Sequence, residues 1–187
     1  MSKIQQAESS PFIVRPLEVE DAGTLTDFYV RNREFHREWS PIFPSEYYTT
    51  EFQRSRLQES VELRRRDQEY RFGIFLQQER GQILIGCINL TGIVRRSFQN
   101  GHLGYSIDGG YEGKGIMTAA LKDVMKFAFH QLGLHRLEAN FMPHNTASRR
   151  VLEKCGFSRI GTSPKMLLIN GDWRDHEMYM ILVEDFN

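Results

Sequence analysis

The chain has 187 residues, of which 40% are apolar and 26% charged, and its 24 basic and 24 acidic side chains give a formal net charge of zero. This composition is typical of a globular protein, and we expect a single domain over residues 1–187 with a core at about 12–182. A neutral chain indicates no general attraction to nucleic acid or to a membrane surface. The two cysteines are too few for a disulfide framework, and the six histidines lack zinc-ligand spacing, so no metal is expected.

The N-terminal stretch "MSKIQQAESSPF" has no apolar segment of signal-peptide length. No uncharged apolar run approaches the roughly 20 residues that a membrane-spanning helix needs. We therefore expect a cytoplasmic protein.

The first half of the chain alternates between strand and helix patterns. Apolar spacing and turn residues predict a strand at 11–19, helices at 20–39 and 49–70, a hairpin of strands at 70–78 and 82–94 around the turn "ERGQ", and a strand at 101–107. Aromatic and proline residues gather at 35–48, where we expect either the wall of a binding site or a plain core and loop.

The second half begins with a helix from about 116 to 132 and a strand at 135–143. A short helix at 145–155 follows, with Asn145 placed as its N-cap and Gly156 just beyond its end. Asn170-Gly171 then separates two apolar runs, which is the strongest short-range hairpin signal. Because strands and helices do not alternate strictly, the order predicts a mixed sheet.

Four glycines crowd the seven residues 109–115, directly before the helix that starts at Ile116. The first turn of a helix has unpaired N–H groups and the positive end of the helix dipole, and residues without Cβ let an anion approach. The pattern predicts a phosphate site, with Lys114 adding charge at its rim. The alternative is a flexible loop before a core helix, and the pattern fits neither the P-loop nor the dinucleotide-binding fingerprint.

Three stretches carry a resemblance to a known family. Gly110-Tyr111-Glu112-Gly113-Lys114-Gly115 has the two glycines of the pattern Q/R-x-x-G-x-G/A, with Gly110 in place of Gln or Arg. "NFMPHNTASRRVLEKCGF" has an Asn, a Ser and a closing Gly-Phe at matching places, and "LLINGDWRDHEMYMI" matches a last hairpin. Together they resemble the GNAT superfamily of N-acetyltransferases, and within it the branch that acetylates the N-terminal alanine of ribosomal proteins.

The resemblance implies an α/β fold, with a mixed and largely antiparallel sheet that is splayed between its fourth and fifth strands and flanked by helices on both faces. It implies acetyl-CoA as cosubstrate, with the pyrophosphate on backbone N–H groups and the pantetheine arm along the splayed strands. The residues implied to bind it are Ile107, Gly113, Lys114, Gly115, Ile116, Met117, Thr118 and Asn145.

The same branch implies Ser148 as the hydroxyl that protonates the leaving thiolate, because Leu152 stands where many members carry a tyrosine. A first-turn helix serine without a catalytic role is the alternative. For the general base, Glu138 is our candidate, with Asp175 and His176 as others, and each has a structural ion pair or a surface position as its alternative.

An N-terminal α-amine is the acceptor that needs least help, since its pKa of ≈ 7.7–8.0 lies more than two units below that of lysine. We expect direct attack on the thioester without an acyl-enzyme, on a protein N-terminus that the resemblance places on a ribosomal protein. The alternatives are a small amine, such as a polyamine or an antibiotic, and a weakly catalytic CoA-binding module on the ribosome. The basic residues 64–66 and 95–96 are either RNA contacts or solvated surface.

Overall fold

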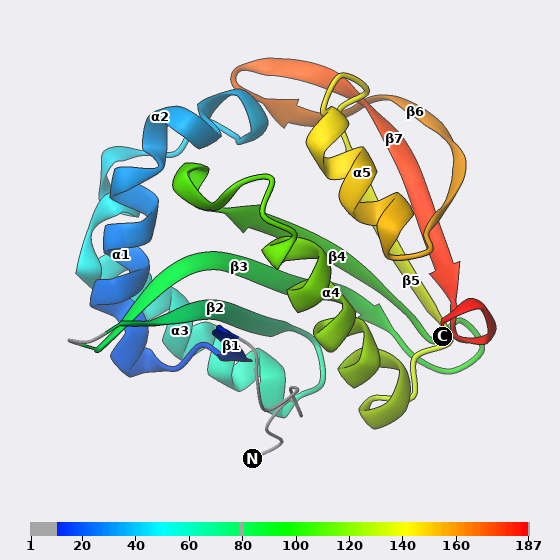
Figure 1. The fold of residues 1–187 in the computed structure, drawn as a ribbon, viewed down its shortest axis with the longest axis horizontal. Helices are drawn as coiled ribbons and strands as arrows, with labels where there is room; N and C mark the ends of the chain where they lie inside the picture. Colours follow the sequence, from blue (N-terminus) through cyan, green and yellow to red (C-terminus); the bar gives the residue numbers. More distant parts are fainter. Residues whose placement is uncertain (1–10, 79–80, 187) are drawn as a thin grey trace.

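The structure is a computed structural model that describes residues 11–78 and 81–186. The N-terminal stretch before residue 11 and residues 79–80 of the predicted "ERGQ" turn lie outside the described residues. The described chain forms one seven-stranded sheet in the order β1-β2-β3-β4-β5-β7-β6 (Figure 1). Its strands are β1 Phe12–Pro16, β2 Tyr70–Gln78, β3 Gly81–Val94, β4 Asn100–Ile107, β5 Arg136–Phe141, β6 Ser158–Ile169 and β7 Asp172–Leu182.

Helices fill the intervals that the sequence predicts. They are α1 Ala22–Arg31, α2 Arg33–His36, α3 Thr50–Arg65, α4 Ile116–Lys126 and α5 Thr146–Lys154, with a π-helical turn at Phe127–Gln131 that extends α4. Short 3-10 turns lie at Val19–Asp21, Arg37–Trp39, Ser45–Tyr48, Gly109–Tyr111 and Val183–Asp185. In the described part of the chain, no helix is long and apolar enough to cross a bilayer.

The helix expected at 20–39 is broken, and Asn32 explains the break. Its backbone leaves the helical region (φ −101°, ψ 7°), while its side-chain Nδ2 donates to the Phe28 carbonyl at 2.9 Å and to Asp108 Oδ2 at 3.1 Å. A long-range partner 76 residues away thus overrides the helical pattern.

The sheet is antiparallel except at its centre, where β4 and β5 run parallel. Their pairing extends only from Asn100↔Arg136 to Leu103↔Ala139, although β4 continues to Ile107 and β5 to Phe141. Beyond Leu103 the two strands diverge, and this confirms the predicted splay.

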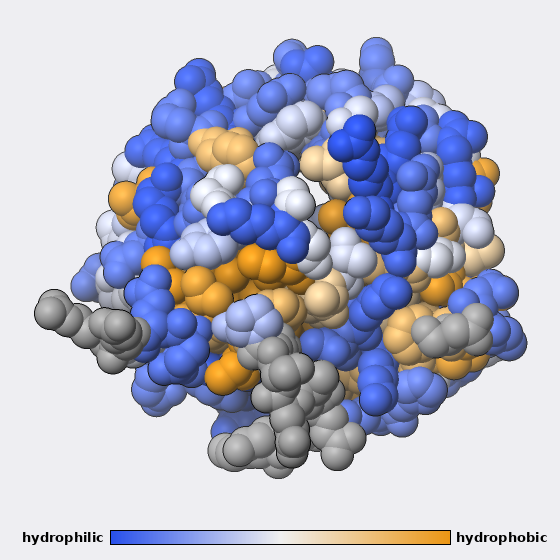
Figure 2. Space-filling model, in the orientation of Figure 1, coloured by the Kyte–Doolittle hydropathy of each residue, from blue (hydrophilic) through white to orange (hydrophobic). Residues whose placement is uncertain are grey.

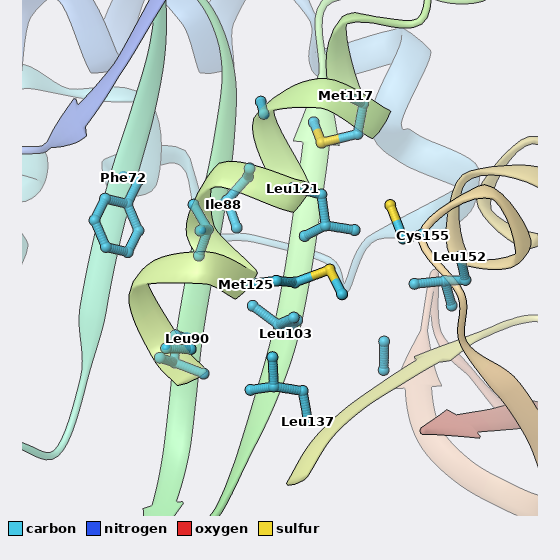
Figure 3. Close-up of a cluster of buried hydrophobic side chains, with 14 of the residues drawn as sticks. Phe72, Ile88, Leu90, Leu103, Met117, Leu121, Met125, Leu137, Leu152 and Cys155 are labelled. Atoms are coloured by element: carbon cyan, nitrogen blue, oxygen red, sulfur yellow. The ribbon is translucent and has the colours of Figure 1, made fainter. Parts of the chain in front are cut away.

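Both faces of the sheet are covered. On one face α4 and α5 lie over the central strands, and the α4 side chains Met117, Leu121 and Met125 pack above Ile88 and Leu103 (Figures 1 and 3). On the other face α1 and α3 cover β2 and β3 through a second cluster that contains Phe28, Leu57 and Phe75. The cluster under α4 and α5 is the larger one and holds the start of α4 rigidly against the sheet.

The hairpin at Asn170-Gly171 is confirmed, with positive φ values of 47° and 87° at its two central residues. Its tip is tied across the molecule, because the Asn170 N–H donates to the Ser40 carbonyl at 3.0 Å. In Figure 1 the tip of β6 and β7 lies beside α2 at the top of the molecule. The segment after α2 and the last hairpin therefore form one continuous rim.

Candidate active site

A cleft of about 910 Å³ lies at the splayed end of β4, between the start of α4, the start of α5 and the segment around α2. The space-filling view is hollowed at this place (Figure 2). Of the residues that the sequence predicts for the site, the cleft brings together Ile107, Gly113, Gly115, Ile116, Met117, Thr118, Asn145 and Ser148.

The start of α4 presents bare backbone to the cleft. Gly113 and Gly115 adopt positive φ values of 73° and 76°, and no atom lies within 4 Å of a Cβ built at either position. Gly115 is the N-cap and no side chain caps the helix, whose first backbone bond runs from the Ala119 N–H to the Gly115 carbonyl at 3.1 Å. The N–H groups of Ile116–Thr118 therefore have no partner within the helix, and the residues fit an anion such as a diphosphate.

The loop between β4 and α4 is fixed by Asp108. Its carboxylate accepts from Arg31 Nε at 2.6 Å, from Asn32 Nδ2 at 3.1 Å and from the Gly110 N–H at 3.0 Å. Burial alone raises the pKa of this carboxyl, but the hydrogen bonds from Arg31, Asn32 and Gly110 outweigh burial and lower the pKa overall. Asp108 is thus held as an anion that ties the glycine loop to α1.

The last residue of β4 turns its backbone N–H toward the cleft, while its carbonyl lies 2.8 Å from His36 Nε2. The Asp108 N–H donates to the Ile85 carbonyl of β3 at 2.8 Å. Since successive strand residues direct their backbone groups to opposite sides, the Ile107 N–H and carbonyl point away from β3, into the gap that β5 leaves. An extended amide-bearing ligand can pair with such an edge as an added strand does.

The opposite wall of the cleft is the start of α5. Asn145 is its N-cap, with Oδ1 accepting from the Ser148 N–H at 2.9 Å, so the capping role is confirmed. The Ser148 hydroxyl lies 2.7 Å from the Tyr105 hydroxyl of β4. Burial raises the pKa of Tyr105, and its hydrogen bond to Ser148 lowers it by less, so the phenol stays protonated.

The structure does not bring two predicted site residues into this cleft. Lys114 is exposed and turns back, with Nζ donating to the Gly110 carbonyl at 2.8 Å above the Tyr111 ring. Glu138 lies within β5, where Arg136 Nε donates to it at 2.6 Å and His102 Nε2 lies 3.5 Å away. Its carboxylate is engaged in this cluster and is absent from the cleft lining, so Glu138 does not enter our proposal.

The two other candidates for the base are engaged elsewhere as well. The Asp175 carboxylate accepts from the Lys165 N–H at 2.8 Å within the last hairpin. His176 is buried, with Nδ1 3.0 Å from the Arg174 carbonyl. Neither side chain lines the cleft.

Two histidines that line the cleft carry no signal in the sequence. His36 of α2 has Nε2 2.8 Å from the Ile107 carbonyl, and His144, after β5, has Nε2 3.2 Å from Glu38 Oε1. The Trp39 ring is tilted against the His144 ring, with the two centroids 5.2 Å apart. In the sequence, only the aromatic residues of 35–48 indicated that this segment lines a site. The contacts of His36 and His144 join residues 71 and 106 positions apart, and no local sequence pattern predicts such contacts.

A nucleophilic cysteine is not available at the site. Both cysteines are buried, and burial raises the pKa of Cys87 to about 12 and that of Cys155 to about 11. Neither lines the cleft, so thiolate attack from the protein does not fit this geometry. Within residues 11–78 and 81–186, no three His, Cys, Asp or Glu side chains gather as metal ligands.

A smaller hollow of about 310 Å³ adjoins the cleft, and His36 and Ser40 line both. Arg33 lies over the Tyr48 ring at 4.5 Å, and Asn170 of the hairpin tip closes the hollow. Together the two hollows run from the glycine loop to the rim formed by α2 and the last hairpin.

Comparison with known proteins agrees with this architecture. The model of the acetyltransferase (GNAT) domain matches residues 12–158. A probable N-acetyltransferase of Bacillus subtilis, YjcK, is 45% identical over 172 residues, which are 92% of this chain and 94% of that protein.

Two solved structures superpose closely. The ribosomal-protein-S5-alanine acetyltransferase of Vibrio fischeri has a TM-score of 0.91 at 33% identity, covering 97% of this chain and 98% of that one. Mycobacterium smegmatis RimJ in complex with CoA-disulfide has a TM-score of 0.86 at 26% identity, covering 92% and 82%. With its glycine-built helix start and splayed sheet, the chain belongs to the GNAT family of acetyltransferases.

Proposed function

We propose that the enzyme transfers the acetyl group of acetyl-CoA to the N-terminal α-amine of a protein, and that the acceptor is a ribosomal protein beginning with alanine. The observation that carries the proposal is the pair of adjoining hollows, which join an anion site at α4, the Ile107 N–H at the splayed strand edge and an open acceptor rim. A ribosomal acceptor would place the enzyme in the cytoplasm.

In this proposal the chain binds acetyl-CoA mainly through backbone. The N–H groups of residues 113–118 hold the diphosphate, and the left-handed glycines keep Cβ atoms away from it. The free edge of β4 pairs with the pantetheine amides, and Asn145 is their partner on the opposite wall. The CoA complex of the mycobacterial relative supports this ligand.

Ser148 and Ile107 would serve the chemical step. As the amine attacks the thioester carbonyl, the Ile107 N–H stabilises the developing oxyanion. The Ser148 hydroxyl protonates the leaving thiolate, and the Tyr105 hydroxyl at 2.7 Å orients it. Since a thiol has a pKa near 8.5, this donor assists the departure without being indispensable.

The acceptor rim favours a peptide over a polyamine. A polycation site needs clustered carboxylates, but Glu46, Glu51, Glu59 and Glu62 line neither hollow. The smaller hollow instead contains arginines and tyrosines, with Glu34 paired to Arg37 at 3.5 Å. The name of the Vibrio fischeri relative supports an alanine N-terminus as the acceptor.

The test is acetyl transfer from acetyl-CoA to a ribosomal peptide that begins with alanine. Matched reactions contain the same peptide with a blocked N-terminus, spermidine, or no acceptor, and mass spectrometry locates the acetyl group. We expect the free α-amine to be acetylated and the blocked peptide to be inert. Preference for spermidine would contradict the acceptor, and failure of every amine would favour a CoA-binding module without catalysis.

A further inference from the structure

His36 of α2 is a titratable side chain in direct contact with the last residue of β4. Its Nε2 atom is 2.8 Å from the Ile107 carbonyl oxygen. A carbonyl can only accept, so Nε2 carries the proton of this bond and, in the neutral ring, Nδ1 keeps the lone pair. The backbone of β4 therefore fixes the tautomer that leaves Nδ1 free to act as a base.

We propose that His36 is the general base of the reaction and removes a proton from the acceptor α-ammonium at Nδ1. This inference rests on the proposed function, because it assigns the base for an amine acceptor. A general base must lie close to the reacting amine. His36 contacts Ile107, whose N–H points into the gap between β4 and β5, and its side chain lines both hollows. An amine that enters from the rim must pass this imidazole to reach a thioester at Ile107.

The packing around His36 favours a neutral ring. The imidazole lies against the Phe28 and Phe35 rings, with centroids at 5.7 Å and 5.3 Å. Burial lowers the pKa of His36 below its ordinary value of 6.5 and outweighs the Ile107 hydrogen bond and the charges of Asp108 and Glu112, which raise it. The ring is therefore mostly unprotonated at pH 7 and able to accept a proton.

Other titratable groups surround the hollows that His36 lines. They are Glu34, Arg33 and Arg37 on α2 and the turn after it, the neutral Tyr29 and Tyr47 in the smaller hollow, and Glu38 with His144 in the cleft, while Arg31 of α1 binds Asp108 next to Ile107. Arg31 is paired with Asp108 at 2.6 Å and Arg37 with Glu34 at 3.5 Å, so most of these charges are balanced locally.

The proton balance of the step is complete without a further reactant. His36 takes one proton from the ammonium, and the freed lone pair forms the bond from nitrogen to the acetyl carbon. The bond from carbon to sulfur breaks with its electron pair staying on sulfur, which takes the proton of Ser148. The second proton of the amine restores Ser148, and His36 releases its own proton to water.

The test compares kcat/KM of the wild type and His36→Gln between pH 6.5 and 9, with an alanine-starting peptide. The glutamine amide can still donate a hydrogen bond to the Ile107 carbonyl, so this substitution keeps that bond and removes the base. We expect a defect of about 100-fold at pH 6.5, the lower end for general-base catalysis. The defect should shrink about tenfold per pH unit, because the α-amine with a pKa of ≈ 7.7–8.0 loses its proton unaided.

A defect that is the same at every pH would mean that His36 only positions α2, and would overturn the inference. So would a pH-dependent defect in His144→Gln but not in His36→Gln. His135→Gln, an exposed histidine paired with Glu184 away from the cleft, is the matched control and should behave as wild type. Thermal unfolding of each variant confirms that it is folded.

A second readout does not depend on the acceptor. The nitrogen chemical shifts of the His36 ring at pH 7 should show Nε2 protonated and Nδ1 unprotonated, and a protonated Nδ1 would overturn the inference directly. If the wild type acetylates no N-terminal amine, the proposed function fails and the base fails with it. If the wild type acetylates the peptide but the pH dependence is absent, only the base fails.

Discussion

The two ends of the cleft are built in different ways. At the α4 end, consecutive residues of one segment present their backbone, and Gly113 and Gly115 contribute the absence of a side chain. At the acceptor end, side chains such as His36 and His144 arrive from α2, from the turn after β5 and from the tip of the last hairpin. The first end is a local feature of the chain, whereas the second exists only after the sheet has formed.

Among the substitutions that test this difference between the two ends, we expect the largest loss of CoA affinity at Gly115. A Gly115→Val substitution places a β-branched side chain at φ 76° and a Cβ where the anion would lie. The added side chain would block access to the backbone N–H groups at the start of α4, so we expect a roughly 10- to 100-fold weaker Kd for CoA. Isothermal titration calorimetry measures this loss.

Gly133 provides the matched control, because it has φ 66°, open space around its Cβ position and a place at the other end of the same helix. Gly133→Val should destabilise the fold by a similar amount and leave the Kd for CoA unchanged. Equal loss of CoA affinity in both variants would show that strain alone, and not the anion site, explains the effect.

The wall formed by α5 should show the next largest effect. Ser148→Ala removes the hydroxyl but keeps the backbone N–H that Asn145 caps. We expect kcat to fall roughly 30-fold with little change in KM. This fall is smaller than the usual contribution of a general acid, because a thiolate leaves readily without protonation. Ser148→Thr, which keeps a hydroxyl, should retain most of the activity in the same steady-state assay, and an unchanged kcat in Ser148→Ala would refute the donor.

Asp108, which ties the glycine loop to α1, should make a contribution to stability that depends on pH. Asp108→Asn is expected to lower the free energy of unfolding at pH 7 by about 1 to 1.5 kcal/mol, since hydrogen bonds to a charged group are lost or weakened. The pKa of Asp108 is lowered in the folded state. Its contribution is therefore full above the unfolded pKa of ≈ 3.9 and is lost as the pH falls through the folded value.

Urea unfolding between pH 7 and pH 3 measures this contribution, and the difference between Asp108→Asn and wild type should narrow in acid. The control is Asp172→Asn, whose exposed pair with Arg174 at 2.8 Å should contribute within about 0.5 kcal/mol at any pH. A difference that stays constant from pH 7 to pH 3 would argue against ionisation as the cause.

The smallest effect is expected at Lys114, the exposed side chain beside the glycines. Because it turns back to the Gly110 carbonyl, Lys114→Ala should weaken CoA binding only about two- to threefold, and less at high salt. A tenfold loss in calorimetry would mean that the ammonium group binds the nucleotide directly, and the α4 end would then depend on side chains as well.

The sequence predicted what depends on local pattern. The strand and helix order is confirmed, as are the splay of the sheet, the Asn145 cap and the hairpin at Asn170-Gly171. Each of these follows from periodicity, from a capping side chain or from a residue that tolerates positive φ.

What the sequence did not predict depends on tertiary contact. The break at Asn32 requires Asp108, and the position of His36 requires the end of β4. Glu138 appeared suitable as a base because of its residue type, but Arg136 two residues earlier along β5 engages its carboxylate. Titratable residues carry a function only through the groups that surround them, and the sequence does not give those groups.

The most direct test of the account is the amide NMR spectrum of the protein as CoA is added. We predict that the largest shifts occur at the backbone N–H groups of residues 113–118, followed by Ile107. Saturable binding with its largest shifts around Arg33 and Tyr48, in the smaller hollow, would place the nucleotide at the acceptor end and contradict the account.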